Sequence, residues 1–206
     1  MTDELLSVWQ STPYPDLLTE IYWEGKRDFV PILADGAAVA LAATLADKPR
    51  RILEIGTAIG YSGLLMLGVA PRAEMVTLDI DPDRLERATT RFVQAGAQER
   101  VRVIREDAMT FLSMTDMTFD FVLLDGPKAH YADMLPDLVR ILEAGGRIFV
   151  DDVNYLGLVA GEEPVIHKHR TIVGNMRTFV KQVKEDARLE VTDLSGGDVL
   201  LIRKRI

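Results

Sequence analysis

Acidic residues recur at the ends of short apolar runs in this 206-residue chain. In a parallel sheet such runs are strands, and ligands bind at the edge where their carboxyl ends meet. A single aspartate after a strand is ordinarily the N-cap of the next helix. That interpretation accounts poorly for the same feature at several strand ends. The acids are Glu54, Asp79, Asp107, Asp125 and the pair Asp151–Asp152.

Three of these acids could hold a metal ion. Asp125, Asp151 and Asp152 offer oxygen ligands without histidine or cysteine, which favours a hard cation such as Mg²⁺ with positions open for water or substrate. Three carboxylates would over-neutralise a divalent cation, so an anionic substrate is less welcome. Lys128 follows in the run D-G-P-K, and nearby cations would lower its pKa. It is a candidate general base; the alternative is a surface lysine at a helix start.

The stretch Arg51–Gly63 predicts a buried strand that runs into a glycine turn and then a helix. Gly56 and Gly60 flank the turn, where a side chain would block a ligand. Glu54 places an acid where a phosphate-binding loop would avoid one. Such a turn suits a ligand that carries a positive charge and a ribose, and S-adenosylmethionine is such a ligand. An ordinary strand-to-helix turn is the alternative.

The glycine spacing disfavours a dinucleotide. A dinucleotide-binding turn needs glycine two residues after the first and again three residues later, and these places hold Ala58 and Tyr61. Asp79 stands about 20 residues beyond the turn, the place from which an acid reaches ribose hydroxyls. Asp107 and Ala108 lie at the next strand end, near where an adenine would rest; the alternative is a helix N-cap at Asp107.

The elements that must position these residues alternate between strand and helix from Arg51 onward. This alternation implies right-handed parallel crossovers, and therefore an α/β, Rossmann-like, doubly wound sheet of about seven strands. The last two apolar runs predict an antiparallel hairpin joined by residues 195–198. The predicted strands are 51–55, 75–80, 101–106, 119–125, 147–151, 189–194 and 199–203, and the predicted helices are 61–69, 82–95, 108–113, 131–143 and 166–186.

Residues 1–48 form a helical front section before this core. The patterns predict helices at Thr2–Gln10 and Asp16–Trp23, a loop at Trp23–Arg27 and an alanine-rich helix at Ile32–Ala46. We expect a single domain over 1–206, with its Rossmann-like core at 49–206.

Composition excludes several classes of function. The chain has no cysteine, which removes disulfides, thiolate metal sites and cysteine nucleophiles, and its three histidines disfavour a histidine-rich metal site. A net charge of −8 disfavours a broad nucleic-acid surface. Residues 165–206 nevertheless carry a net charge of +4, so a local basic patch is one interpretation and a solvated helix face with a charged tail is the other.

No leader pattern occurs at Met1–Gln10 and no long apolar stretch follows, so we expect a cytoplasmic protein without a membrane partner.

The chain resembles S-adenosylmethionine-dependent, metal-dependent O-methyltransferases of the catechol and caffeoyl-CoA type, from about Ile32 to the C-terminus. The resemblance rests on successive motifs: L-E-I-G-T-A-I-G-Y-S, V-T-L-D-I-D, R-E-D-A, F-D-F-V-L-L-D-G-P-K-A-H-Y and G-G-R-I-F-V-D-D-V. Further on, the chain resembles the bacterial branch that contains tRNA 5-hydroxyuridine methyltransferase, in D-D-V-N-Y-L-G-L-V-A-G-E-E and H-R-T-I-V. Leu156 stands where that branch has a basic residue.

The family resemblance implies a set of site residues. Donor contacts are expected at Ile32, Ser62, Asp79, Asp107, Ala108 and Asp125, and the position of the turn adds Glu54 and Gly56. Magnesium is expected at Asp125, Asp151 and Asp152. The family usually has asparagine where this chain has Asp152, which leaves the charge balance and the choice of metal open. Asp125 and Lys128 are the expected catalytic residues.

The acceptor must present an oxygen that is deprotonated or nearly so. Two vicinal oxygens can chelate the metal, which lowers the pKa of the acceptor and fixes its direction. Both 5-hydroxyuridine at the tRNA wobble position, our first choice, and a small catechol-like phenol offer such a pair. The run His167–Arg170 would hold tRNA phosphates if it lies near the pocket; elsewhere it is merely the start of a helix.

Two other classes of function remain as alternatives. A nicotinamide oxidoreductase is disfavoured by Ala58 and Tyr61 in the turn. A non-catalytic S-adenosylmethionine-binding module would have little reason to keep Asp125, Lys128 and the two following aspartates in register. Apolar surface on the front helices and on the final hairpin also predicts a homodimer.

Overall fold

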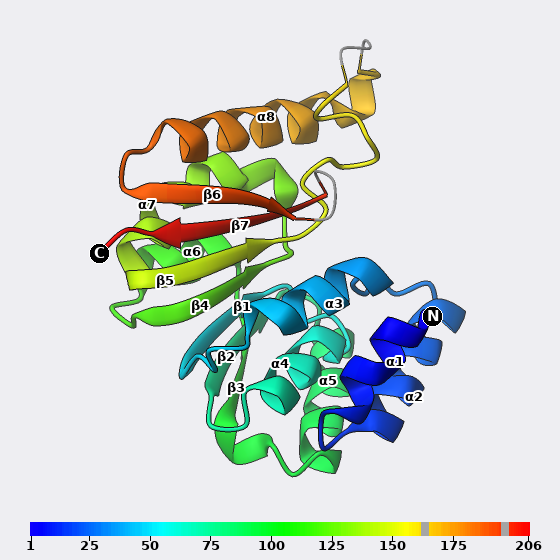
Figure 1. Ribbon diagram of the computed structural model, residues 1–206. Coiled ribbons are helices and arrows are strands. Elements are labelled where there is room, and N and C mark those ends of the chain that lie inside the picture. Colours follow the sequence, from blue (N-terminus) through cyan, green and yellow to red (C-terminus); the bar gives the residue numbers. More distant parts are fainter. Residues whose placement is uncertain (162–164, 195–197) are drawn as a thin grey trace. The chain divides into compact units, whose positions relative to one another are not determined.

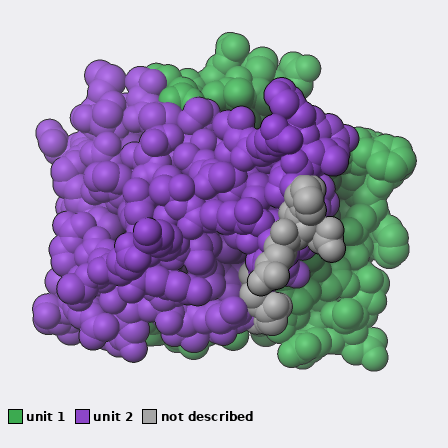
Figure 2. Space-filling view, turned by 90° about the horizontal axis from the view of Figure 1, so that it is seen from above, with its two compact units in different colours: residues 1–107 green, residues 108–206 purple. Residues whose placement is uncertain are grey.

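The computed structural model describes residues 1–161, 165–194 and 198–206 (Figure 1). The chain divides into two compact units, Met1–Asp107 and Ala108–Ile206, called unit 1 and unit 2 below (Figure 2). The expected single domain, with its boundary between front section and core at residue 48, stays a prediction. Residues 195–197 of the predicted hairpin connection and residues 162–164 of the segment before the predicted helix 166–186 lie outside the described residues.

Unit 1 contains three parallel strands in the order β3-β2-β1: β1 (Arg51–Ile55), β2 (Glu74–Asp79) and β3 (Val101–Arg105). Ile55 pairs with Leu78 and Asp79 pairs with Arg105, so the carboxyl ends of the three strands share one edge. Helix α4 (Tyr61–Val69) is buried along nearly all of its length. It connects β1 to β2, and α5 (Pro82–Gln94) with the short 3-10 turn η1 (Gln98–Arg100) connects β2 to β3 (Figure 1).

Three front helices pack on this unit: α1 (Asp3–Gln10), α2 (Pro15–Arg27) and α3 (Asp35–Thr44). Helices α2 and α3 contact α4, and the indole of Trp9 in α1 donates a hydrogen bond to the Tyr61 hydroxyl at 3.2 Å. The predicted loop at Trp23–Arg27 is wrong, because α2 continues through it. Gly25 there is buried, and a side chain on it would approach Ile32 to 3.0 Å. The predicted helix start at Ile32 is also wrong, since α3 begins only at Asp35.

An ion-pair network fastens α2 to α5. Glu24 accepts hydrogen bonds from the guanidinium groups of Arg87, at 2.5 and 2.9 Å, and Arg91. Only 13% of the Glu24 side chain is exposed, whereas Glu20, which also pairs with Arg91, is 60% exposed. Burial alone would raise the pKa of Glu24, but the two arginines lower it below its ordinary value of 4.5.

We expect Glu24→Gln to lower the free energy of unfolding by about 2 kcal/mol at pH 7, because it leaves two half-buried guanidinium groups short of an anion. A carboxyl group with a lowered pKa in the folded state stabilises the fold above its ordinary pKa. That contribution is lost as the pH falls through the lowered value, so the difference between variant and parent should narrow as the pH falls below the ordinary value of 4.5. Urea unfolding at several pH values measures it. Glu20→Gln, the exposed control, should change stability by less than about 0.5 kcal/mol; equal losses in the two variants would contradict the assignment.

Unit 2 contains four strands in the order β4-β5-β7-β6: β4 (Phe119–Leu124), β5 (Leu142–Val150), β6 (Leu189–Leu194) and β7 (Val199–Lys204). The β4–β5 pair is parallel, and β7 runs antiparallel to both β5 and β6. Its helices are α6 (Ala108–Met114), α7 (Tyr131–Ile141) and α8 (Arg170–Glu185), with 3-10 turns η2 (Lys128–His130) and η3 (His167–His169). Helix α8 contacts both α7 and β6 (Figure 1).

Two predicted element starts in unit 2 are wrong, and the predicted end of the helix 131–143 is two residues too late. The structure ends α7 at Ile141 and begins β5 at Leu142, five residues before the predicted start at Arg147. Gly145, with φ of 77°, and Gly146 lie inside the strand, next to an irregularity of the register opposite Phe119 and Phe121. Glycine thus marks a local distortion of a strand here rather than its beginning. Helix α8 starts at Arg170, after the 3-10 turn, and not at Ile166.

The fold class is confirmed. The described residues form seven strands, three in unit 1 and four in unit 2, which pair mostly in parallel and end in an antiparallel hairpin. Strands and helices alternate as in a Rossmann-like α/β fold. Within the described ranges, every helix is too short or too polar to cross a membrane.

Candidate active site

The turn after β1 adopts backbone angles that require glycine at two of its positions. Gly56 has φ of 106° and Gly60 has φ of 86°. A side chain at Gly60 would also approach the backbone of Ala88 in α5 to 3.2 Å. Backbone N–H groups of Gly56 and Thr57 donate to the carbonyl of Leu78 in β2, which ties the turn to the neighbouring strand. The turn is therefore fixed against β2 before any ligand arrives.

A buried carboxylate supports this turn from within. Glu54 is fully buried, and its two oxygens accept hydrogen bonds from the hydroxyls of Ser62 and Thr77, each at 2.5 Å. Thr77 also lies 2.6 Å from the hydroxyl of Thr57 in the turn. Glu54 and Ser62, two of the residues predicted to contact the methyl donor, are thus hydrogen-bonded to each other. Thr57 and Thr77 were missed by sequence reasoning; two threonines at this turn and in the facing strand are the signal for such a network.

Asp79 holds the part of the turn that lacks glycine. Ala58 has φ of 44°, an unusual value for a residue with a side chain, and its N–H donates to Asp79 Oδ2 at 2.9 Å. Asp79 Oδ1 accepts the N–H of Asp81 at 3.0 Å. Each carboxylate oxygen has a second acceptor site, so the half-buried Asp79 can still accept a hydrogen bond from a hydroxyl group.

The remaining predicted donor residues lie on other segments. Ile32 is half-buried between α2 and α3 and packs against Gly25. Asp107 is exposed after β3, and its N–H donates to the Glu106 side chain at 3.0 Å. Ala108 is buried as the first residue of α6. Their contacts with a donor stay predictions.

In unit 2, three acids follow the carboxyl ends of β4 and β5. Leu124 pairs with Val150 in the parallel register, so Asp125 and Asp151 follow at the same edge, and the Asp151 N–H donates to the Leu124 carbonyl at 3.3 Å. Asp152 follows with φ of 48°, in the left-handed region.

Lys128 lies among these acids. Its ammonium is 3.3 Å from Asp125 Oδ1 and 3.4 Å from Asp152 Oδ2. The lysine side chain is 13% exposed, compared with 31% for Asp125 and 48% for Asp152. The alternative of an ordinary surface lysine is therefore wrong.

Burial and crowding shift the proton affinities of this cluster. Burial raises the pKa of Asp125, and the charge of Asp152 adds to it while Lys128 opposes it. Burial and Asp125 together raise the pKa of Asp151 to about 7. Burial alone would lower the pKa of Lys128, but Asp125, Asp152 and Asp151 outweigh it and raise that pKa. Negative charge at this edge thus exceeds what one ammonium compensates.

The donor set fits a hard divalent cation in its chemistry. Asp125, Asp151 and Asp152 supply carboxylate oxygens only, and added positive charge would relieve the cost of burying two of them. In the part of the chain that the structure describes, however, no three acidic or histidine side chains converge as a ready-made metal site. Asp125 and Asp152 each direct one carboxylate oxygen to Lys128 instead, so the ammonium competes with a metal for them.

Tyr131 orients the turn that carries Asp125. Its fully buried hydroxyl accepts the N–H of Gly126 at 2.9 Å and lies 3.3 Å from the Leu124 carbonyl, to which it can donate. The burial of Tyr131 gives it a supporting place behind the site rather than a place in its lining. His130 is half-exposed and faces Asp133 at 3.8 Å.

The segment after Asp152 leads to the basic run. His167, Lys168 and Arg170 are exposed at η3 and the start of α8, whereas His169 is half-buried and its Nδ1 lies 3.2 Å from the Tyr155 hydroxyl. The run is therefore both a solvent-facing basic surface and the start of a helix.

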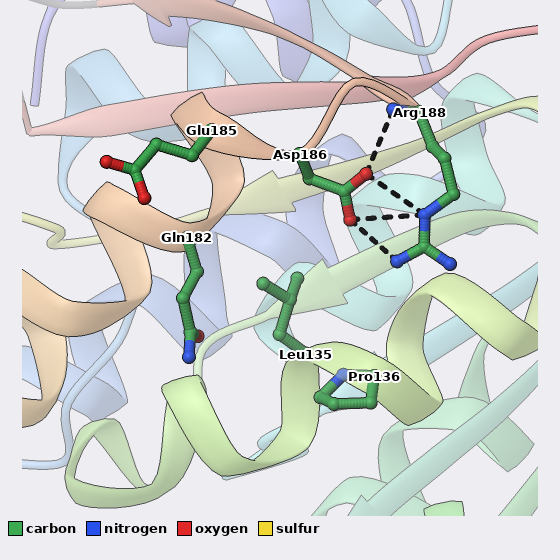
Figure 3. Close-up of a pocket in the computed structure, with 6 residues that line it drawn as sticks. All are labelled: Leu135, Pro136, Gln182, Glu185, Asp186 and Arg188. Atoms are coloured by element: carbon green, nitrogen blue, oxygen red, sulfur yellow. Dashed lines mark hydrogen bonds and ion pairs between the residues drawn. The ribbon is translucent and has the colours of Figure 1, made fainter.

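A surface pocket also occurs in unit 2, away from the predicted site residues. It has a volume of about 360 Å³ and lies between α7 and the C-terminal end of α8 (Figure 3). Asp186 and Arg188 form an ion pair of 2.6 Å at its rim. Its lining residues are Leu135, Pro136, Gln182, Glu185, Asp186 and Arg188. None of them is a candidate site residue, so this pocket is not the candidate active site.

Comparison with known proteins adds an independent finding. A model of the family described as O-methyltransferase matches residues 34–206. O-methyltransferase hkm8 of Aspergillus hancockii is 28% identical over an alignment 214 residues long, which covers 88% of this chain and 85% of that protein. An Arabidopsis thaliana protein named as a caffeoyl-CoA O-methyltransferase is 28% identical over 162 residues, which cover 76% of this chain and 70% of that protein. The crystal structure of the SAH-bound methyltransferase PaMTH1 of Podospora anserina has a TM-score of 0.75 and 26% identity, covering 100% of this chain and 89% of that one.

Proposed function

The chain belongs to the O-methyltransferase family, which uses S-adenosylmethionine, and from this premise we propose that it methylates one of two adjacent oxygens on a ring with the help of a divalent cation. The observation that supports this is the contact of Asp125 and Asp152 with the Lys128 ammonium, next to Asp151 at the same strand edge. The expected homodimer and the cytoplasmic location are proposed with it.

The turn after β1 is proposed to bind the donor. Its glycines leave the backbone open to a ligand, and Asp79 would accept a ribose hydroxyl with its remaining lone pairs. Glu54 would act through Ser62, because its carboxylate is fully buried. Ile32, Gly56, Asp107 and Ala108 complete the proposed donor contacts.

The acid cluster is proposed to hold the cation and orient the acceptor. Asp125, Asp151 and Asp152 would be its protein ligands, and when bound the cation, Mg²⁺ in our proposal, would lower the pKa of the acceptor hydroxyl. Asp125 would also face the donor, as the family resemblance implies. In the transfer itself an acceptor oxygen forms a bond to the methyl carbon while the carbon–sulfur bond breaks, and a neutral thioether leaves.

Lys128 is proposed to take the acceptor proton. In the structure its charge is held by Asp125 and Asp152. These carboxylates are the proposed cation ligands, so their engagement with a cation would remove the groups that raise the lysine pKa, and like charge would lower it further. Nζ could then accept the proton from the hydroxyl that attacks the methyl group.

A small catechol-like phenol is the acceptor that the observations favour. Leu156, four residues after Asp152, is 73% exposed and offers an apolar contact rather than a cation. The name of the Arabidopsis relative also refers to a phenolic acceptor.

The 5-hydroxyuridine of the tRNA wobble position is the second candidate. It offers the same pair of adjacent oxygens, and the exposed side chains of His167, Lys168 and Arg170 would supply contacts to phosphates.

Methyl transfer from labelled S-adenosylmethionine, with Mg²⁺ and with chelator, tests the proposal. One reaction contains a simple catechol and another contains tRNA that carries 5-hydroxyuridine. Cation-dependent label in the catechol alone supports the first acceptor, and label in the tRNA alone supports the second. Donor binding without transfer to either acceptor would favour the binding module, and full transfer in chelator would contradict the role of the cation.

A further inference from the structure

We propose that Arg177 of α8 is a positioning residue that fixes the acceptor loop, residues 153–161, and thereby sets the KM for the acceptor. This inference rests on the proposed function, because it takes the segment after Asp152 to be a wall of the acceptor site. All residues in the argument belong to unit 2.

The guanidinium group of Arg177 donates hydrogen bonds to three carbonyl groups of the loop. Arg177 Nε donates to the Val159 carbonyl at 3.0 Å, and Nη2 donates to the carbonyls of Leu158 at 3.0 Å and Gly161 at 2.6 Å. A planar fork of N–H donors can reach several acceptors at once, whereas a lysine ammonium is a single point charge on a flexible stem. The arginine therefore defines the path of the loop rather than only balancing charge.

The start of the loop has a backbone that local preferences do not explain. Tyr155 and Leu156 have φ of 38° and 60°, in the left-handed region that residues with side chains seldom adopt, and Gly157 follows with φ of 75°. Such a conformation persists only where surrounding contacts determine it. The contacts of Arg177 lie just beyond this stretch, at residues 158–161.

Further contacts hold the loop at its beginning. The Val153 N–H donates to the Asp198 carbonyl at 2.8 Å, next to β7. Asn154 accepts the N–H of Ala160 with its side chain at 3.0 Å and the N–H of Val159 with its carbonyl at 3.1 Å. The Tyr155 ring packs edge-on against His169, with 5.6 Å between ring centroids. These contacts close the loop on itself, and Arg177 attaches the closed loop to α8.

The loop is continuous with the acid cluster. It begins one residue after Asp152, whose carboxylate lies 3.4 Å from the Lys128 ammonium. Between Asp152 and the residues that Arg177 binds, it presents Leu156 to solvent, 73% exposed. A fixed loop would hold this apolar side chain ready for an acceptor ring, and a loose loop would have to be ordered by each acceptor that binds.

The test compares Arg177→Gln and Arg177→Lys with the parent enzyme. We expect Arg177→Gln to raise the acceptor KM about tenfold, with kcat and the Kd for S-adenosylmethionine changed less than about twofold, because only the ordering of the loop is lost. Arg177→Lys keeps the charge but not the fork, so it should resemble Arg177→Gln. Lys181→Gln is the matched control: it removes a cation one turn along α8, 72% exposed, and should change nothing.

Hydrogen exchange gives a readout that needs no acceptor. The amides of Leu158, Val159 and Ala160 are hydrogen-bonded within the loop, and in Arg177→Gln they should exchange at least about tenfold faster, with little change in β4 and β5. Unchanged exchange together with an unchanged acceptor KM would overturn the inference, as would equal losses of donor and acceptor binding. If the parent enzyme methylates no acceptor, the proposed function fails, and hydrogen exchange alone decides whether Arg177 fixes the loop.

Discussion

Asp125→Ala should greatly weaken methyl transfer and divalent-cation binding together. Asp125 is the one residue proposed both as a cation ligand and as a neighbour of the donor, and its carboxylate also holds the Lys128 ammonium at 3.3 Å. We expect kcat/KM to fall by about 10³-fold, which corresponds to about 4 kcal/mol of transition-state stabilisation. Steady-state transfer of labelled methyl groups and calorimetric titration with Mg²⁺ measure the two losses on the same preparation.

Two variants serve as controls for Asp125→Ala. Asp152→Asn keeps an oxygen ligand at the 48% exposed position, so transfer and cation binding should both persist. Asp133→Asn removes a 58% exposed carboxylate of α7 that faces His130, and it should have no effect on either. Full turnover in Asp125→Ala would remove this residue from the site. Its thermal unfolding should also be recorded, because a misfolded variant would lose both activities for another reason.

Much of the fold could be predicted because hydrophobic periodicity and turn residues are local signals. The strand Arg51–Ile55 and the helix that follows it are as predicted. A short apolar run marks the strand, and the glycines after it mark a turn whose backbone angles require glycine. The misplaced boundaries depend on distant contacts instead. Gly25 lies inside a helix, where its lack of a side chain leaves room for Ile32, and no pattern within Trp23–Arg27 reveals that contact.

The candidate site was predictable to the extent that the topology brings strand ends to one edge. Asp125 and Asp151 meet because β4 and β5 are parallel and in register, which the alternation of elements already implied. How each acid is engaged was not predictable. Glu54 is turned inward to Ser62 and Thr77, and Asp79 is engaged by the N–H of Ala58, because these bonds depend on which side chain faces which across 8 to 23 residues of sequence.

The position of Lys128 illustrates the same difference. Its spacing from Asp125 marked it as a candidate base, but its pairing with Asp152 joins the ends of two strands and is visible only in the folded chain. Its carboxylate neighbours raise its pKa in the structure, an effect that sequence reasoning did not consider, because it took into account only the lowering expected from a bound metal and a sulfonium. The proposed cation ligands are thus the present partners of the proposed base.

That competition makes Lys128→Met the sharpest test of the mechanism. We expect kcat to fall by about 10³-fold, within the range ordinary for the loss of a general base. Cation binding should be retained or tighter, because Asp125 and Asp152 no longer have the ammonium as a partner. Activity should therefore fall without a loss of cation binding, which unfolding of the site would not produce.

Lys128→Arg separates proton transfer from charge. Arginine keeps the positive charge near Asp125 and Asp152 but does not release its proton in proteins. If Lys128 takes the acceptor proton, this variant should be as slow as Lys128→Met, with the fold and the donor Kd intact. An arginine enzyme that turns over at the parent rate would show that the cluster needs only a cation there, and a methionine enzyme at the parent rate would remove the lysine from the mechanism. Binding of S-adenosylmethionine is a fair internal reference for both variants. The turn proposed to bind it is held by hydrogen bonds to Glu54 and Asp79, which do not involve Lys128.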